Sequence, residues 1–291
     1  MSELARSLRE YNTDPRYAAT VVSNARITSD DSDEDVHELV LDVDRPDLPY
    51  EVGQSIGVVA PADPEFGNES QFRLYSVADL PETGEKGRPR IKICVRRCGY
   101  IDEYSGEWYP GVVSNYLCDL RPGDEVAITG PFGLAFEVPE ERDANLILIG
   151  TGTGIAPFRA FVKHLYRNVP DWTGRVLLFY GAKSGLELLY MNDRKDDFSQ
   201  YYDNETFEAF RALSPRPHWA DPIAWDHAIQ ERGEELWEML GQSETYVYVA
   251  GLEPMRDELD AVLGRLAGSK AKWTRRKAEL VAGKRWVELL Y

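Results

Sequence analysis

Short apolar or alternating segments, separated by prolines, fill the first half of the chain. Residues of high strand propensity recur at 19–28, 36–43, 55–60, 72–78, 90–97 and 125–130. The prolines between these segments mark turns. Short strands in this arrangement are typical of a small antiparallel barrel. A single helix is expected at 113–120, just after Gly111.

The pattern changes after Pro139. Apolar runs at 146–149, 176–180, 246–250 and 286–290 now alternate with segments of helical period at 157–166, 229–240, 254–266 and 273–281. Strands that alternate with helices predict a doubly wound parallel sheet. We therefore expect a β + α/β protein, with an antiparallel β-barrel domain in residues 1–139 and an α/β domain in residues 140–291.

A glycine-rich loop follows the first apolar strand of the second domain. The strand ends in Gly150-Thr151-Gly152-Thr153-Gly154, and a helix is expected to begin at or near Pro157. Backbone N–H groups at such a helix start attract a pyrophosphate. The loop is not the common G-x-G-x-x-G fingerprint, because Pro157 stands where the third glycine would be. The alternative interpretation is an ordinary strand–turn–helix connection.

Composition narrows the function classes. The 291 residues exceed a typical single domain, and the 43% hydrophobic content is enough for packed cores. The net charge of −17 argues against nucleic acid as a partner. No apolar run reaches membrane-spanning length and no signal peptide opens the chain. We therefore expect a cytoplasmic protein without integral membrane contact.

The cysteines and acidic clusters give no sign of a metal centre. The three cysteines, Cys94, Cys98 and Cys118, are too few for the four thiolates of most iron–sulfur clusters. We therefore expect no fused iron–sulfur domain. The acidic residues of segment 30–35 are contiguous and lack the glycine of a calcium loop, so we interpret them as a solvated loop.

Two motifs in the first domain suit a phosphorylated, flat ligand. In Arg73-Leu74-Tyr75-Ser76, strand alternation places Arg73 and Tyr75 on one face. Arginine neutralises phosphate, and tyrosine stacks on flat rings. The second motif, Gly111-Val112-Val113-Ser114-Asn115, precedes a helix. Its polar residues suit a helix N-cap, and its amides suit a phosphate.

The chain carries the motifs R-x-Y-S, G-x-x-S-N and G-T-G-T-G-I-A-P in this order. This arrangement resembles the ferredoxin–NADP reductase family. The resemblance runs from about Tyr17 to the terminal segment Trp286–Tyr291. It implies a flavoprotein that exchanges a hydride between NADP(H) and noncovalent FAD, and single electrons between FAD and ferredoxin or flavodoxin. The alternative is a dedicated NAD(P)H-dependent reductase component of an oxygenase or desaturase. A non-enzymatic flavin-binding module is the third hypothesis.

The resemblance also implies roles for residues of the first domain. Tyr75 would cover one flavin face, Ser76 would lie beside the nitrogen that receives the hydride, and Arg73 would meet the FAD pyrophosphate. Tyr100 would stack on the adenine, which favours FAD over FMN. The flavin-binding residues implied are Arg73, Leu74, Tyr75, Ser76, Cys94, Arg96, Tyr100, Gly111, Val112, Val113 and Ser114.

In the second domain the resemblance implies a nicotinamide nucleotide site. Ser214 and Arg216 would contact the 2′-phosphate, although Pro215 separates them and the family's following lysine and tyrosine are not found. Because of these two residues we expect NADP(H) as the nucleotide, with NAD(H) as the alternative. Trp219 or Trp225 would replace the tyrosine. The nucleotide-binding residues implied are Gly152, Thr153, Gly154, Pro157, Ser214, Arg216, Gly251, Leu252 and Tyr291.

The C-terminus and two basic clusters complete the expectations. Glu288 and Tyr291 resemble the family's terminal pair and, with Ser76, are the expected catalytic residues, but two leucines separate them instead of one residue. Tyr291 would cover the open flavin face and gate nicotinamide entry. Partner docking is expected on two basic clusters: Arg88, Arg90, Lys92, Arg96 and Arg97, and Arg275, Arg276, Lys277, Lys284 and Arg285.

Overall fold

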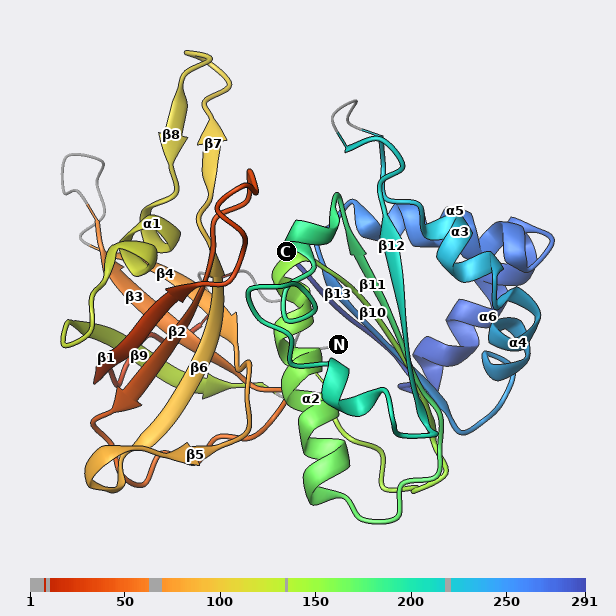
Figure 1. The fold of residues 1–291 in the computed structure, drawn as a ribbon, viewed down its shortest axis with the longest axis horizontal. Coiled ribbons are helices and arrows are strands. Elements are labelled where there is room, and N and C mark those ends of the chain that lie inside the picture. The colour runs from red at the N-terminus through yellow and green to blue at the C-terminus, as the bar shows by residue number, and fades with distance from the viewer. Residues whose placement is uncertain (1–7, 9–10, 63–69, 134–135, 218–220) are drawn as a thin grey trace. The chain divides into compact units, whose positions relative to one another are not determined.

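The computed structural model describes residues 8, 11–62, 70–133, 136–217 and 221–291. The chain divides into two compact units (Figure 1). The first comprises Met1–Leu134 with Arg159–His164, and the second comprises Ala135–Phe158 with Leu165–Tyr291. The boundary that we expect between residues 139 and 140 lies a few residues beyond this division.

The first unit is built on a seven-stranded antiparallel sheet of order β4-β3-β9-β1-β2-β6-β5. Val77, just after β4, forms an antiparallel bridge with Ile93 of β6, and the Ala78 amide donates to the Lys92 carbonyl at 2.8 Å. The sheet therefore curls until its two sides meet, as expected for a barrel. The strands are β1 (Tyr17–Arg26), β2 (Val36–Val43), β3 (Ser55–Pro61), β4 (Ser70–Ser76), β5 (Glu82–Thr83), β6 (Pro89–Arg96) and β9 (Glu125–Phe132).

Strand alternation fills the interior of this barrel. Leu39 and Leu41 of β2 and Ile91 and Ile93 of β6 are fully buried in one cluster. Helix α1 (Val112–Asp119) adds Val113 and Leu117 to the same cluster. The helix expected at 113–120 is therefore present one residue earlier, and its apolar side anchors it to the barrel.

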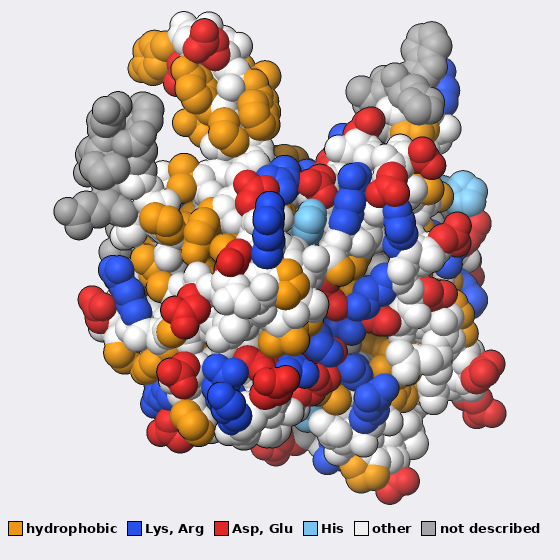
Figure 2. Space-filling view, turned by 60° about the vertical axis from the view of Figure 1, so that its left-hand side comes forward, with side chains coloured by type: hydrophobic (Ala, Val, Ile, Leu, Met, Phe, Trp, Pro, Cys, Tyr) orange, Lys and Arg blue, Asp and Glu red, His pale blue; other side chains and the backbone are white. Residues whose placement is uncertain are grey.

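A short hairpin of β7 (Gly99–Ile101) and β8 (Trp108–Pro110) projects from the first unit (Figure 1). The sequence analysis did not predict these strands, because they are only three residues long and almost wholly exposed. Hydrophobic side chains cover much of the hairpin (Figure 2). The exposed large ones are Tyr100, Ile101, Tyr104, Trp108 and Tyr109.

The second unit contains a five-stranded parallel sheet of order β12-β11-β10-β13-β14. The strands are β10 (Asn145–Thr151), β11 (Val176–Ala182), β12 (Phe207–Leu213), β13 (Thr245–Gly251) and β14 (Trp286–Leu290). The strand order reverses at β10. Open α/β sheets bind ligands at such a switch point, outside the carboxyl ends of the strands. Residues Gly152–Gly154 and Leu252 follow directly after β10 and β13.

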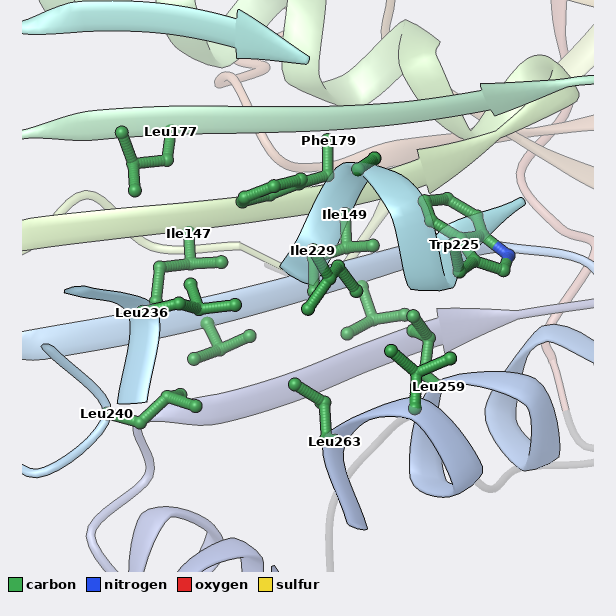
Figure 3. Close-up of a cluster of buried hydrophobic side chains, with 14 of the residues drawn as sticks. Ile147, Ile149, Leu177, Phe179, Trp225, Ile229, Leu236, Leu240, Leu259 and Leu263 are labelled. Atoms are coloured by element: carbon green, nitrogen blue, oxygen red, sulfur yellow. The ribbon is translucent and has the colours of Figure 1, made fainter. Parts of the chain in front are cut away.

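Helices pack on one face of this sheet around a large apolar cluster (Figure 3). In the close-up, side chains from the sheet meet side chains from the helices; the labelled ones are Ile147, Ile149, Leu177, Phe179, Trp225, Ile229, Leu236, Leu240, Leu259 and Leu263. The helices of the second half of the chain are α2 (Ile155–Asn168), α3 (Trp225–Gln230), α4 (Gly233–Met239), α5 (Met255–Leu266) and α6 (Lys270–Ala282).

In the second half of the chain, three elements differ from the sequence expectation. The helix expected at 229–240 is two helices, α3 and α4, with Gly233 beginning the second. Helix α2 begins at Ile155, so Pro157 lies inside its first turn, where its missing N–H costs no hydrogen bond. Strand β12 was not predicted, because Glu208 and Arg211 interrupt its apolar pattern at the sheet edge.

Short 3₁₀ segments complete the described chain: η4 (Glu85–Gly87), η5 (Gly152–Gly154), η6 (Gly185–Glu187) and η7 (Ser199–Tyr201). Among the described residues, none of the helices combines the length and apolar character needed to span a bilayer.

A buried carboxylate in the first unit contacts three basic side chains. Asp79 is 1% exposed, and its carboxylate contacts Lys92 Nζ at 2.8 Å, Arg159 Nη1 at 3.2 Å and Lys163 Nζ. Burial alone would raise the pKa of Asp79. The charge of Arg159 and the hydrogen bonds from Lys163 and Lys92 outweigh burial and hold the pKa well below its usual range. Asp79 is therefore ionised wherever the protein is folded near neutral pH.

We expect Asp79→Asn to lower the free energy of unfolding by about 3 kcal/mol, because it leaves buried cations without their carboxylate. The pKa of Asp79 is lower in the folded state than in the unfolded chain. Its stabilisation is therefore complete above about pH 4 and is lost as the pH falls further. Denaturant unfolding at several pH values measures both effects.

The control is Asp226→Asn, which removes a carboxylate from an exposed pair with Arg265. We expect this change to cost less than about 1 kcal/mol. Equal losses in the two variants would mean that the Asp79 cluster does not stabilise the fold.

Candidate functional site

Strand β4 carries the R-x-Y-S motif at the edge of the sheet. It pairs with β3, and none of its residues is fully buried. Arg73 is exposed, Tyr75 is half-buried, and Ser76 Oγ lies 3.5 Å from Ser55 Oγ. Burial raises the pKa of the Tyr75 hydroxyl above its usual range. Tyr75 therefore stays a neutral phenol, which suits ring stacking rather than proton transfer.

The start of α1 is fastened to the segment before the hairpin. Ser114 Oγ accepts a hydrogen bond from the Cys98 amide at 3.1 Å. The Asn115 side chain donates to the carbonyls of Cys98 at 2.8 Å and Gly111 at 2.7 Å. Gly111 stands at the N-cap, and a Cβ there would lie 3.1 Å from the Cys98 carbonyl oxygen. These bonds hold the first turn of α1 in place, and its amides have no acceptor within the helix.

Tyr100 stands on the hairpin as an exposed aromatic platform. It is 57% exposed, and its ring stacks on Tyr109 with centroids 5.8 Å apart at 24°. Tyr109 in turn donates from its hydroxyl to Glu107 at 2.9 Å. A ring braced on one face and open on the other suits stacking by a flat ligand such as adenine.

Cys94 and Arg96, two further residues expected at the flavin, lie on strand β6. Cys94 is buried in β6, and the Arg96 guanidinium pairs with Glu34 at 3.3 Å. Both residues lie on the face of β6 opposite to Ile91 and Ile93, which fill the barrel interior. The Arg96 side chain is engaged by Glu34 in an ion pair.

The first unit fits FAD on three observations. Tyr100 offers an open ring, the first turn of α1 offers amides for a pyrophosphate, and Arg73 offers an exposed cation on the strand that carries Tyr75. FMN lacks the adenine that would use Tyr100.

In the second unit, two backbone segments approach each other too closely for side chains. Gly152 has φ +52°, a conformation that favours glycine. A Cβ on Gly154 would lie 2.3 Å from the Ala250 carbonyl oxygen, and a Cβ on Gly251 would lie 2.2 Å from Thr151 Oγ1. The glycine-rich loop therefore packs directly against the carboxyl end of β13. The first amides of η5 and α2 lie in this loop.

The C-terminal tyrosine lies on this loop. The Tyr291 hydroxyl and Thr153 Oγ1 are 2.5 Å apart, within hydrogen-bond distance. The Tyr291 amide donates to the Gly251 carbonyl at 3.0 Å, and its own carbonyl accepts from the Glu253 amide at 3.2 Å. Tyr291 is still 54% exposed. The tail is therefore held beside the expected nucleotide site by a small number of hydrogen bonds.

Glu288 lies among three side-chain donors. Its carboxylate contacts Arg256 Nε at 2.7 Å, Lys277 Nζ at 3.0 Å and Trp286 Nε1 at 2.7 Å. Burial opposes ionisation, but these three donors outweigh it and lower the pKa of Glu288. Successive strand residues face opposite sides, so the extra leucine turns Glu288 away from the side of Tyr291. The carboxylate of Glu288 is therefore engaged by Arg256, Lys277 and Trp286, and its expected catalytic role stays a prediction.

The region expected at the 2′-phosphate contains an unexpected carboxylate. Ser214 Oγ donates to the Asp221 carbonyl at 2.8 Å, and Arg216 Nε lies 2.8 Å from the Asp221 carboxylate. Sequence reasoning missed Asp221, although it follows Arg216 by only five residues. Trp225 is 1% exposed in the core, so it offers no adenine platform, and Trp219 lies outside the described residues.

The first basic cluster is largely matched by carboxylates. Arg90 pairs with Asp42, Lys92 with Asp79 and Glu82, Arg96 with Glu34, and Arg97 with Asp35 and Asp119. Opposite charges paired in this way largely cancel, so they contribute little field at a distance. In the second cluster Arg276 and Lys277 are paired as well, whereas Arg275 and Lys284 lie exposed. The expected docking role of the first cluster is therefore weakened.

Among the described residues, no group of three or more histidine, cysteine, aspartate or glutamate side chains is placed to hold a metal ion.

Comparisons with known proteins agree with this reading of the two units. Residues 19–136 match the oxidoreductase FAD-binding domain model, and residues 148–260 match the oxidoreductase NAD-binding domain model. Ferredoxin–NADP reductase of Synechocystis sp. is 32% identical over 282 residues, covering 95% of this chain and 68% of that protein.

Chloroplastic ferredoxin–NADP reductase, leaf isozyme 1, of Oryza sativa subsp. indica is 35% identical over 286 residues, covering 95% of this chain and 77% of that protein. A variant of ferredoxin-NADP+ reductase from Plasmodium falciparum, solved with 2′P-AMP, shares the fold with a TM-score of 0.70. It is 20% identical and covers 97% of this chain and 98% of its own. The chain therefore belongs to the ferredoxin–NADP reductase family and is a flavoprotein oxidoreductase of that type.

Proposed function

We propose that this flavoprotein exchanges a hydride between NADP(H) and noncovalently bound FAD, and single electrons between FAD and ferredoxin or flavodoxin. The observation that carries the proposal is the glycine-rich loop at the sheet switch point, with Tyr291 bonded to Thr153 across it. The names of the relatives, ferredoxin–NADP reductases, support the same pair of substrates.

The first unit would bind the flavin. Bound FAD supplies the step between two-electron and one-electron transfer. Arg73 and the amides of Val113 and Ser114 would hold its pyrophosphate, and the open face of Tyr100 would take its adenine. Tyr75 would cover one face of the flavin, with Ser76 next to it on the same strand.

The second unit would bind the nucleotide. The amides around Gly152–Gly154 would meet its pyrophosphate, and Gly251 and Leu252 would line the nicotinamide end. Hydride transfer needs no side-chain proton donor, only two rings held in contact. The chain's task is therefore to orient the rings and exclude water. The bond between Tyr291 and Thr153 supports a role for Tyr291 in covering the flavin until the nucleotide arrives.

A dedicated reductase component of an oxygenase or desaturase is the second candidate. Two observations favour it over a general ferredoxin reductase: the first basic cluster is paired internally, and Asp221 alters the region of Ser214 and Arg216. Both candidates share the flavin and nucleotide chemistry, so the electron acceptor separates them.

The test of the proposed function begins with the purified yellow protein. We expect gentle denaturation to release FAD, and we expect NADPH to bleach the bound flavin under anaerobic conditions. A screen of one-electron acceptors then separates ferredoxin or flavodoxin from an oxygenase partner. Release of FMN, or a flavin that neither NADPH nor NADH reduces, would refute the proposal.

We expect Tyr291→Ser to tighten binding of oxidised nucleotide by about tenfold, because nicotinamide no longer has to displace a ring. Turnover should fall through slower release, and discrimination between NADP+ and NAD+ should relax. Titration of both nucleotides into the holoenzyme measures these changes. Tyr291→Phe is the matched control, since it removes only the hydroxyl bonded to Thr153 and should give a smaller change. Unchanged affinities and flavin spectrum in Tyr291→Ser would mean that the tail does not lie on the ring.

Partner docking should depend on the exposed cations of the second cluster. We expect Arg275→Glu with Lys284→Glu to slow electron transfer to ferredoxin by about tenfold at low salt, and less above physiological ionic strength. Reduction of a small uncharged dye should be unaffected. Stopped-flow measurements at several salt concentrations check this. Equal loss with both acceptors would indicate damage to the fold instead of a docking defect.

A further inference from the structure

The segment that follows β12 is closed on itself by two contacts. Ser214 is buried directly after the strand, and its hydroxyl donates to the Asp221 carbonyl oxygen at 2.8 Å. The Arg216 guanidinium meets the Asp221 carboxylate twice, with Nε at 2.8 Å and Nη2 at 3.4 Å. One backbone atom and one carboxylate of Asp221 thus hold both residues expected at the 2′-phosphate.

The position of Asp221 is fixed by the fold around it. Shortly after it, the Ala224 amide donates to the Leu213 carbonyl at 3.2 Å, and Trp225 is buried in the sheet core. The Asp221 side chain is 23% exposed, whereas that of Arg216 is 66% exposed. The carboxylate is therefore the less exposed partner of the pair, and the guanidinium is the more exposed one.

This pairing changes what the site does with an anion. A phosphate monoester carries close to two negative charges at neutral pH. A 2′-phosphate would have to share Arg216 with Asp221 and would be repelled by the carboxylate. A free ribose 2′-hydroxyl has no charge and donates a hydrogen bond to a carboxylate. Acidic residues of NAD-binding sheets accept such a bond. Asp221 therefore disfavours binding of a nucleotide with a 2′-phosphate and does not disfavour binding of one without it.

We propose that Asp221 is a specificity-determining residue of the nucleotide site. It competes with the 2′-phosphate for Arg216, and it reduces the ratio of the affinity for NADP(H) to the affinity for NAD(H). The inference rests on the proposed function, because it assigns the end of β12 to the adenosine side of the nucleotide.

The test uses 2′-phospho-AMP and AMP as probes, because neither carries a nicotinamide that would involve the flavin or Tyr291. Calorimetric titration of the holoenzyme compares Asp221→Asn, Arg216→Gln and the double variant with the parent. We expect Asp221→Asn to tighten 2′-phospho-AMP by about tenfold and to leave AMP unchanged or slightly weaker. The gain should be clearly smaller when the double variant is compared with Arg216→Gln, because only the direct repulsion by the carboxylate remains to be relieved there.

Asp226→Asn is the matched control. It removes the same charge from another exposed pair, with Arg265, five residues along the chain. We expect it to leave both affinities within about twofold, as for a screened exposed charge. A gain equal to that of Asp221→Asn would reduce the effect to net charge and overturn the proposal.

The opposite outcome is equally informative. If Asp221 serves to position Arg216 for the phosphate, Asp221→Asn will weaken 2′-phospho-AMP, and the proposal is wrong. Equal tightening of both probes also overturns it. Failure of the proposed function is separate, since it would appear as a bound flavin that neither NADPH nor NADH reduces, whatever the probes show.

Discussion

The second unit depends on one close approach, between the glycine-rich loop after β10 and the carboxyl end of β13. At Gly154 a single added carbon would lie 2.3 Å from the Ala250 carbonyl oxygen. No side chain fits there, so the loop turns at the strand end and α2 begins at Ile155. The same close contact places Gly251 next to the loop. Tyr291 lies there too, because its amide donates a hydrogen bond to the Gly251 carbonyl. The proposed nucleotide site is therefore a consequence of backbone packing at the sheet switch point.

Carboxylates set the second constraint. The net charge is −17, and several of the cations to which the sequence analysis gave a role have an acidic partner. Asp79 gathers Lys92, Arg159 and Lys163 in the first unit, and Asp221 holds Arg216 in the second. The cost of leaving a partly buried charge unpaired explains why these pairs form. It also means that the presence of an arginine or lysine does not by itself make a docking or phosphate site.

The sequence by itself determined the architecture. Alternating apolar residues predicted six of the barrel strands, and the change of period after Pro139 predicted the parallel sheet, because both patterns reflect local burial. The order of R-x-Y-S, G-x-x-S-N and the glycine-rich loop pointed to the family, which the comparisons established. Edge strand β12 and the hairpin were missed, since exposed or interrupted strands lack that period.

Only the tertiary structure decided how the individual side chains are used. Glu288 turns toward Arg256 and Lys277 because one extra leucine shifts its face on β14, and a sequence motif does not specify the face. Trp225 is buried against the sheet, where sequence reasoning had considered it an adenine platform. Arg96 meets Glu34, which lies 62 residues earlier in the chain, and Arg216 meets Asp221, five residues later. Such pairings depend on distances between segments after folding, which residue order alone does not contain.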